Sequence, residues 1–225
     1  MTPASTTSPA SPPEGVGETA GNTGPRFLDF YFDFVSPYGY FVLHQIEPLA
    51  QRHGRMLRWH PFHMRAVTKE VLGMTQAMAD VPLKGDYLRN DVRRTARYLG
   101  VPYQPAPAAG FSSVTASRVF YLINEHDPAA AARHAHAVFH SHHAQARSPN
   151  TWADCSALAT SAGADPAWLI EREQAERGRE LFRQATADAV AHGVWGTPSF
   201  RVDGEMFWGS DRLGQLDEWL RVGGW

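Results

Sequence analysis

The sequence contains a single cysteine, and this scarcity excludes a class of chemistry. Cys155 is the one cysteine among 225 residues, so the chain forms no internal disulfide and has no CxxC redox pair. The surrounding stretch TWADCSALAT predicts a helix. We therefore interpret Cys155 as a small buried hydrophobic residue.

The sequence also lacks an excess of positive charge and a long apolar run. It has 21 Lys and Arg against 23 Asp and Glu, which gives a formal net charge of -2. Nothing in this balance favours binding to nucleic acid or to an anionic membrane surface. No apolar run reaches the roughly 18 residues that a membrane-spanning helix needs. We expect neither nucleic acid nor a membrane as a partner.

The first 25 residues, MTPASTTSPASPPEGVGETAGNTGP, have little hydrophobic content. They are dominated by Pro, Ser, Thr, Gly and Ala, a composition typical of disorder. They also lack the basic and apolar stretches of a secretory signal peptide. We predict a disordered tail over residues 1–25 and a cytoplasmic protein.

Strand patterns occur at both ends of the remaining chain. FLDFYFDFV (27–35) is nearly all apolar, as in a central strand, and Pro37 suits the first position of a following helix. RMLRWHPF (55–62) then predicts a second, parallel strand. Near the other end, TPSFRVDGEMFWG (197–209) predicts a hairpin that turns at Asp203-Gly204.

Between these ends, residues 65–183 show helical patterns alone, separated by prolines. SDRLGQLDEWLRVGG closes the chain as a further helix, with Ser210 or Asp211 as its N-cap. We expect an α/β protein with a thioredoxin-like fold. Residues 26–64 and 184–225 would form the thioredoxin-like domain, and residues 65–183 an inserted all-helical domain.

Three stretches resemble the 2-hydroxychromene-2-carboxylate isomerases and kappa-class glutathione transferases, within the larger DsbA-like group. They are DFYFDFVSPYGYF (29–41), LKGDYLRNDVRRTARYLGVPY (83–103) and GVWGTPSFRVDGEMFWGSDRL (193–213). The resemblance extends from about Pro25 to the end of the chain. It implies glutathione as the cofactor, bound between the thioredoxin-like and helical domains.

The turn Ser36-Pro37-Tyr38-Gly39 occupies the place where redox thioredoxins carry CxxC. Neither end of this turn offers a protein thiolate, so disulfide exchange there is excluded. The N–H groups and dipole of a helix start favour an anion, and the Ser36 hydroxyl can donate a hydrogen bond to sulfur. The turn therefore suits a thiolate carried by a ligand. The alternative is that Ser36 is only a helix cap.

The resemblance also implies the other contacts to glutathione. A cis Thr197–Pro198 bond would turn the Thr197 backbone toward the tripeptide, Asp211 would pair with its α-amino group, and Ser210 would hold its α-carboxylate. Arg212 would either neutralise that carboxylate or brace Asp211. Trp195 and Trp208 would lie in the core or in the wall of the cleft. The expected cofactor-binding residues are Pro37, Tyr38, Trp195, Thr197, Pro198, Ser210, Asp211 and Arg212.

The resemblance places substrate contacts on the first inserted helix. A substrate carboxylate needs a cation, for which Lys84 is the first choice, with Arg94 and the aromatic Tyr87 beside it. The alternative for each charge is a solvated helix face. Two departures from the family pattern, SSVT at 112–115 and HPFHMRAVTKE at 60–70, leave the substrate open.

The run RHAHAVFHSHHAQ contains five histidines, of which His136 and His140 are one helical turn apart. A shared metal would use such a spacing. However, no cysteine lies at a ligand spacing, and no HExxH motif is present. We expect no metal, and interpret the histidines as surface or packing residues.

Together these features predict a glutathione-dependent isomerase. By resemblance, it interconverts 2-hydroxychromene-2-carboxylate and trans-o-hydroxybenzylidenepyruvate during bacterial breakdown of aromatic hydrocarbons, using a glutathione thiolate held by Ser36. A kappa-class-like glutathione transferase is the first alternative, and a non-catalytic glutathione-binding DsbA-like module is the second. The partner would be a small aromatic molecule, and the sequence leaves a homodimer open.

Overall fold

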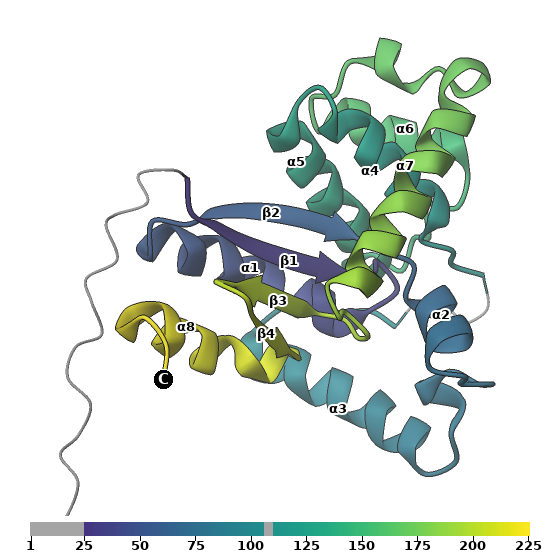
Figure 1. Cartoon of the computed structure of the whole chain (residues 1–225). Coiled ribbons are helices and arrows are strands. Elements are labelled where there is room, and N and C mark those ends of the chain that lie inside the picture. Colours follow the sequence, from purple (N-terminus) through teal and green to yellow (C-terminus); the bar gives the residue numbers. More distant parts are fainter. Residues whose placement is uncertain (1–24, 106–109) are drawn as a thin grey trace, which may run out of the picture.

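The computed structural model describes residues 25–105 and 110–225, and a four-stranded sheet lies at its centre (Figure 1). The strand order is β2-β1-β3-β4; β2 runs parallel to β1, whereas β3 is antiparallel to both β1 and β4. This arrangement confirms the predicted thioredoxin-like topology. The predicted tail, apart from Pro25, lies outside the described residues. The strands are β1 (Phe27–Phe32), β2 (Met56–Pro61), β3 (Ser199–Val202) and β4 (Glu205–Trp208).

Strand β1 lies inside the sheet, between β2 and β3, and its side chains are buried on both faces. Phe30 and Phe32 have no exposed surface, and the Phe30 ring stacks on Phe32 at 4.9 Å and on Phe200 of β3 at 5.7 Å. Helix α1 (Pro37–Arg52) contributes Phe41 and Ile46 to the same core. The strand stops at Phe32, and the chain turns through Asp33 before α1 begins.

The helices inserted between β2 and β3 form two groups (Figure 1). One group, α4 to α7, packs into a bundle at one end of the sheet, while α3 lies apart and contacts α1. The helical insertion is therefore confirmed. Its elements are α2 (Met64–Ala66), η1 (Val67–Val71), η2 (Met78–Asp80), α3 (Lys84–Leu99), α4 (Val114–Asn124), α5 (Pro128–Phe139), η3 (His140–Ala144), α6 (Trp152–Ser161), η4 (Pro166–Leu169) and α7 (Glu171–Ala191).

Helix α7 connects the bundle to the sheet without a break. It passes so close to α4 that a Cβ atom on Gly178 would lie 3.2 Å from Arg118 Cβ. Two turns later, Thr186 Oγ1 accepts a hydrogen bond from the His63 N–H at 3.1 Å, and Ala189 packs in the small cluster around Tyr31. The domain boundary predicted at residues 183–184 falls inside this helix, and the division into domains stays a prediction.

The end of the chain confirms the hairpin and corrects the final helix. Asp203 and Gly204 have positive φ angles of 52° and 90°, which form the tight turn that the sequence predicts. The predicted N-cap at Ser210 or Asp211 is wrong, because neither side chain caps the helix. These residues form their own 3-10 turn, η5 (Ser210–Arg212), so that α8 (Leu213–Val222) starts one turn later.

The single cysteine has the environment that the sequence predicts. Cys155 of α6 has no exposed surface, and its Sγ donates to the Pro149 carbonyl at 3.4 Å. Burial raises the pKa of this thiol to about 12, so it stays protonated and unreactive at neutral pH. This confirms the interpretation of Cys155 as a buried hydrophobic residue.

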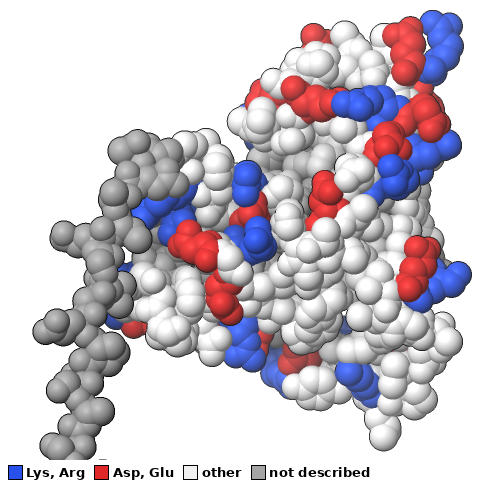
Figure 2. Space-filling model, viewed as in Figure 1, with Lys and Arg blue, Asp and Glu red and all other residues white. Residues whose placement is uncertain are grey.

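Charges of both signs are interspersed on the face shown in Figure 2. Several Lys and Arg side chains lie beside Asp or Glu, and large uncharged areas separate these groups. Arg183–Glu180 and Arg177–Glu125 are examples of the surface ion pairs in the structure. None of the helices in the described part of the chain is long and apolar enough to cross a membrane.

Candidate active site

The start of α1 has free hydrogen-bond donors at the position predicted to hold a thiolate. Ser36 is the N-cap, and its Oγ accepts the Gly39 N–H at 3.2 Å, so its own O–H remains available to donate. Pro37 has no N–H, and the Tyr38 N–H has no partner among residues 25–105 and 110–225. Ser36 is 8% exposed. A small anion at this helix start would therefore meet two donors.

The loop before β3 lies against this turn. The Thr197–Pro198 bond is cis, as predicted. The Asp33 N–H donates to Thr197 Oγ1 at 3.1 Å, and the Ser36 N–H donates to the Asp33 carbonyl at 2.9 Å. The backbone N–H and C=O of Thr197 have no partner in the described residues. They are thus free to pair with an extended peptide, as the sequence predicts.

The η5 turn is attached directly to this loop. The Gly209 N–H donates to the Pro198 carbonyl at 2.9 Å, which fixes the start of the turn beside the cis bond. Ser210 is half-buried, and the Asp211 side chain is exposed. Arg212 Nη2 lies 3.4 Å from Asp211 Oδ2, which agrees with the alternative in which Arg212 braces Asp211.

Trp195 and Trp208 form an exposed aromatic pair beside the same loop. Their ring centroids are 4.1 Å apart, and the residues are 42% and 45% exposed. Trp208 also lies over Gly196, where an added Cβ atom would be 2.2 Å from its Nε1. The structure therefore places neither tryptophan in the core, and a position in the wall of a cleft stays a prediction.

A network of polar side chains connects α1 with α3. The Tyr38 hydroxyl donates to Asp91 Oδ2 at 2.6 Å, and the Tyr87 hydroxyl donates to Asp91 Oδ1 at 3.4 Å. Arg94 forms an ion pair with the same carboxylate. Burial and the bond to Asp91 raise the pKa of Tyr38, and the Tyr38 and Arg94 bonds lower the pKa of Asp91. Tyr38 thus remains a donor, and the charge of Arg94 is offset.

The structure brings two of the three predicted substrate residues to this network. Tyr87 and Arg94 reach Tyr38 through Asp91, while Lys84 is exposed and forms no ion pair with any described residue. The sequence analysis missed Asp91. Residues 84, 87, 91 and 94 recur at helical spacing, so the period of the helix could have identified it.

The sequence analysis also missed Asp33, which lies directly beneath the Ser36 turn. It is 1% exposed, and its carboxylate accepts the Val35 N–H at 3.2 Å and the Met64 N–H at 2.9 Å. Burial raises the pKa of this carboxyl, against hydrogen bonds from Ser113 and the two backbone groups. The available signal was an acidic residue at the end of an aromatic strand.

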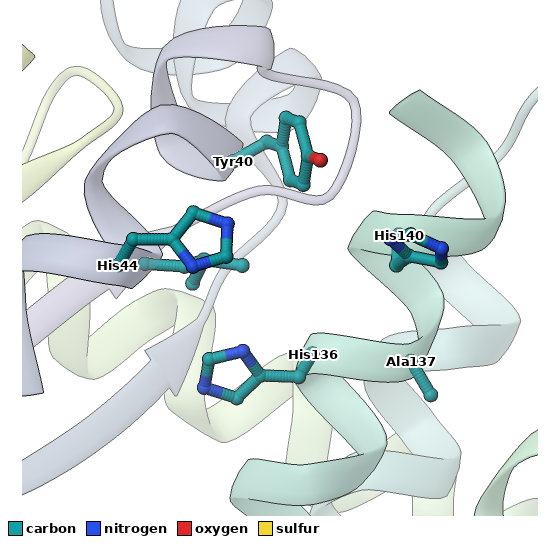
Figure 3. A pocket seen from close by; sticks show the side chains of 6 residues that line it. Tyr40, His44, His136, Ala137 and His140 are labelled. Carbon is teal, nitrogen blue, oxygen red and sulfur yellow. The ribbon is translucent and has the colours of Figure 1, made fainter. Parts of the chain in front are cut away.

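The histidine run divides between buried and exposed positions. Burial lowers the pKa of His134 and His142 to about 4 and that of His143 to about 3, so all three are neutral packing residues. His136 and His140 line a hollow of about 320 Å³ between α1 and α5, which His44 also lines (Figure 3). In residues 25–105 and 110–225, no three His, Cys, Asp or Glu side chains are arranged to hold a metal.

Comparison of the sequence with known proteins identifies the family and its relatives. Residues 27–221 match the family model of the DSBA-like thioredoxin domain. A 2-hydroxychromene-2-carboxylate isomerase of Pseudomonas putida is 27% identical over 190 residues, covering 84% of this chain and 92% of that protein. Glutathione S-transferase kappa 1 of Caenorhabditis elegans is 26% identical over 208 residues, covering 86% and 90%.

A solved structure gives the same answer at the level of the fold. The structure of a 2-hydroxychromene-2-carboxylate isomerase superimposes with a TM-score of 0.76 at 26% identity, and covers 88% of this chain and 94% of that one. The family model spans nearly all of the described chain, including all four strands and both stretches that form the Ser36 turn and the cis-proline loop. The protein therefore belongs to the family of DSBA-like thioredoxin domains.

Proposed function

We propose that this protein is a glutathione-dependent isomerase that acts on 2-hydroxychromene-2-carboxylate. The observation that carries the proposal is the cysteine-free start of α1, where the Ser36 hydroxyl and the Tyr38 N–H are both available as donors. Such a turn suits a thiolate brought by a ligand and has none of its own. The isomerases among the relatives support the same activity.

The residues around this turn suit the tripeptide. The Thr197 backbone has a free donor and a free acceptor for a peptide bond, and Asp211 offers an exposed carboxylate for an ammonium group. When bound, glutathione would supply a thiolate for reversible addition to the conjugated alkene of the substrate, which permits rotation about the former double bond. The role of the protein would be to hold the sulfur, the peptide and the substrate in the orientation that the addition requires.

The donors at Ser36 are strong enough to ionise a thiol at neutral pH. A typical thiol has a pKa near 8.5, and lowering it by about two units requires roughly 2.7 kcal/mol. A helix start contributes about 0.3–1 kcal/mol, and up to about 2 in a partly buried site. A hydrogen bond to a charged acceptor adds about 1.5–3 kcal/mol. Because Ser36 is only 8% exposed, water weakens these terms little, and together they suffice.

The substrate would lie between the Ser36 turn and α3. Lys84 is exposed and carries the cation for the substrate carboxylate, while the ring of Tyr87, which is 59% exposed, offers an aromatic surface. Arg94 is less suited, because Asp91 already neutralises it. These assignments extend the proposal from the cofactor to a small aromatic carboxylate.

A glutathione transferase is the alternative activity, and the kappa-class relatives are the observation that favours it. The same Ser36 turn would serve both reactions. Product analysis separates them, because isomerisation leaves the amount of free glutathione unchanged and conjugation consumes it. Incubation with a chromene carboxylate and with a simple electrophile, followed by thiol quantification, distinguishes the two.

The first experiment is an ultraviolet titration of bound glutathione against pH, read at the thiolate absorbance. We expect the wild-type protein to ionise the bound thiol well below its free pKa, and Ser36→Ala to raise that pKa by about one to two units. Ser161→Ala, at an exposed serine at the end of α6, is the matched control and should titrate like the wild type.

Two results would contradict the proposal in different ways. Binding of glutathione without ionisation in the wild type would favour a non-catalytic binding module. Absence of binding would remove glutathione as the cofactor altogether. A titration of Ser36→Ala identical to that of the wild type would remove Ser36 from its role as thiolate donor.

A further inference from the structure

Asp33 is hydrogen-bonded to three segments of the chain. Its carboxylate accepts the Val35 N–H of the β1–α1 turn and the Met64 N–H at the entry to the helical insertion. The Ser113 hydroxyl, just before α4, lies near the carboxylate and opposes the rise in its pKa. Its backbone N–H donates to Thr197 in the cis-proline loop.

These bonds are buried and therefore well defined. Asp33 and Ser113 are 1% and 3% exposed, so water does not compete for the carboxylate. A buried carboxylate needs several donors, and this one takes them from the turn before Ser36 and from Met64 at the entry to the helical insertion. The position of Ser36 is consequently linked to the position of the insertion through a single side chain.

We propose that Asp33 is a positioning residue that holds the Ser36 turn, the cis-proline loop and the helical insertion in one arrangement. The inference rests on the proposed function, because the turn it positions is the one assigned to the thiolate. Two of the bonded groups are immediate neighbours of site residues: Val35 precedes Ser36, and Thr197 precedes Pro198. Displacements of about 1 Å at such sites cost roughly 100-fold in rate.

Asp33→Asn tests the proposal with little change in shape. The Val35 and Met64 N–H groups donate to different oxygens of the carboxylate, so in the amide one of them would face an NH2 group instead of an acceptor. Asp29→Asn is the matched control. Asp29 lies on β1, four residues before Asp33, and is 6% exposed, but it bonds to the side chains of Arg58 and His60.

We expect Asp33→Asn to raise the pKa of the bound glutathione thiol by about one unit and to lower kcat about 10- to 100-fold. The KM for glutathione should change much less, because the Thr197 backbone and Asp211 remain. Asp29→Asn should leave both the thiol pKa and kcat at the wild-type values. Equal effects in the two variants would overturn the proposal, since they would reflect general loss of stability.

A fall in the thiol pKa would also overturn it, because removal of a nearby negative charge lowers that pKa without any positioning. Amide hydrogen exchange provides a readout that needs no ligand. In Asp33→Asn, exchange should increase at Val35 and at Met64, whose N–H groups donate to the carboxylate, and in Asp29→Asn it should not. If exchange at these amides is unchanged in Asp33→Asn, the inference is wrong even when glutathione binds as proposed.

The exchange readout separates the inference from the proposed function. If wild-type protein fails to bind glutathione, the function is wrong, and exchange still decides whether Asp33 holds the three segments together. Should Asp33→Asn fail to fold, Ser113→Ala removes the hydroxyl near the carboxylate and leaves the Val35 and Met64 bonds. It should shift the thiol pKa and the exchange rates in the same direction by a smaller amount; unchanged values would refute the proposal.

Discussion

At the scale of single residues, the partner of each charged side chain decides whether it is free to meet a ligand. Arg94 and Lys84 lie on one face of α3, but only Arg94 has an acidic partner, Asp91, within the described structure. A cation that is already paired gains little from a second carboxylate, because its charge is offset. The two residues should therefore contribute unequally to substrate binding.

Replacement of the two cations tests this difference. We expect Lys84→Gln to raise the KM for a chromene carboxylate by about 10-fold, the loss of one charge-assisted hydrogen bond at a partly screened site. Arg94→Gln should raise it less, and should instead lower the free energy of unfolding slightly through loss of the Asp91 ion pair. Steady-state kinetics and urea unfolding measure the two effects. The reverse ranking of KM would identify Arg94 as the substrate cation.

Residues with a local sequence signal could be predicted, and residues defined by tertiary contacts could not. Ser36 follows from the strand, the Ser-Pro pair and the missing cysteines, all of which are adjacent in the sequence. The role of Asp33 depends on Met64, Ser113 and Thr197, which are distant along the chain. Asp91 is an intermediate case. The helical spacing predicts the face of α3 on which it lies, but the sequence does not predict its hydrogen bond to Tyr38 of α1.

At the scale of elements, turn chemistry was easier to predict than helix ends. The Asp203-Gly204 hairpin is dictated by two residues that tolerate positive φ angles. The start of α8 was misplaced because Ser210 and Asp211 have the composition of an N-cap, yet the chain enters the helix through a 3-10 turn. The Gly209 bond to Pro198, a tertiary contact, positions that turn.

Gly196 gives a prediction for the element that carries the cis-proline loop. A side chain at this position would collide with the Trp208 indole, because its Cβ would lie 2.2 Å from Nε1. We expect Gly196→Ala to displace Trp208 from Trp195, to change the tryptophan fluorescence and to destabilise the fold by about 1–3 kcal/mol.

Gly214→Ala is the control for this prediction. Gly214 lies in the first turn of α8, and an added Cβ there meets nothing within 4 Å. Alanine has a higher helix propensity than glycine, so this variant should be neutral or more stable by up to about 1 kcal/mol. Similar fluorescence and unfolding curves for the two variants would contradict the prediction, because they would show that the added methyl group neither displaces Trp208 nor destabilises the fold.

At the scale of the whole molecule, buried histidines contribute to the joint between the helical bundle and the sheet side. His143 Nε2 lies 2.9 Å from the Phe34 carbonyl, and its ring stacks on Tyr40 of α1 at 5.4 Å. His134 lies deeper in the bundle, with Nε2 3.3 Å from the Ala116 carbonyl. Each is held neutral by burial, so protonation opposes folding at these positions.

This arrangement predicts a loss of stability in mild acid. The unfolded chain protonates His134 near pH 6.5, whereas the folded protein does so only near pH 4. Between these values the unfolded state binds more protons, so the free energy of unfolding falls as the pH decreases. For His134 alone the loss between pH 7 and pH 4.5 is about 2 kcal/mol. Urea unfolding at several pH values measures it.

His134→Leu should reduce the pH slope of stability by about one proton, or roughly 1.4 kcal/mol per pH unit. His140→Gln changes an exposed member of the same run and should keep the wild-type slope. If both variants retain that slope, the acid sensitivity arises from other groups, and His134 protonates in the folded protein.

The continuity of α7 has a consequence for how the two parts of the molecule can move. Its 21 residues span about 32 Å, and a helix of this length bends only gently. One part packs on α4 and the other on the sheet, so the bundle and the sheet cannot swing apart at this connection (Figure 1). Any separation of the bundle from the sheet would therefore move α7 as one rigid rod, and would break either its packing on α4 or the bond between Thr186 and His63.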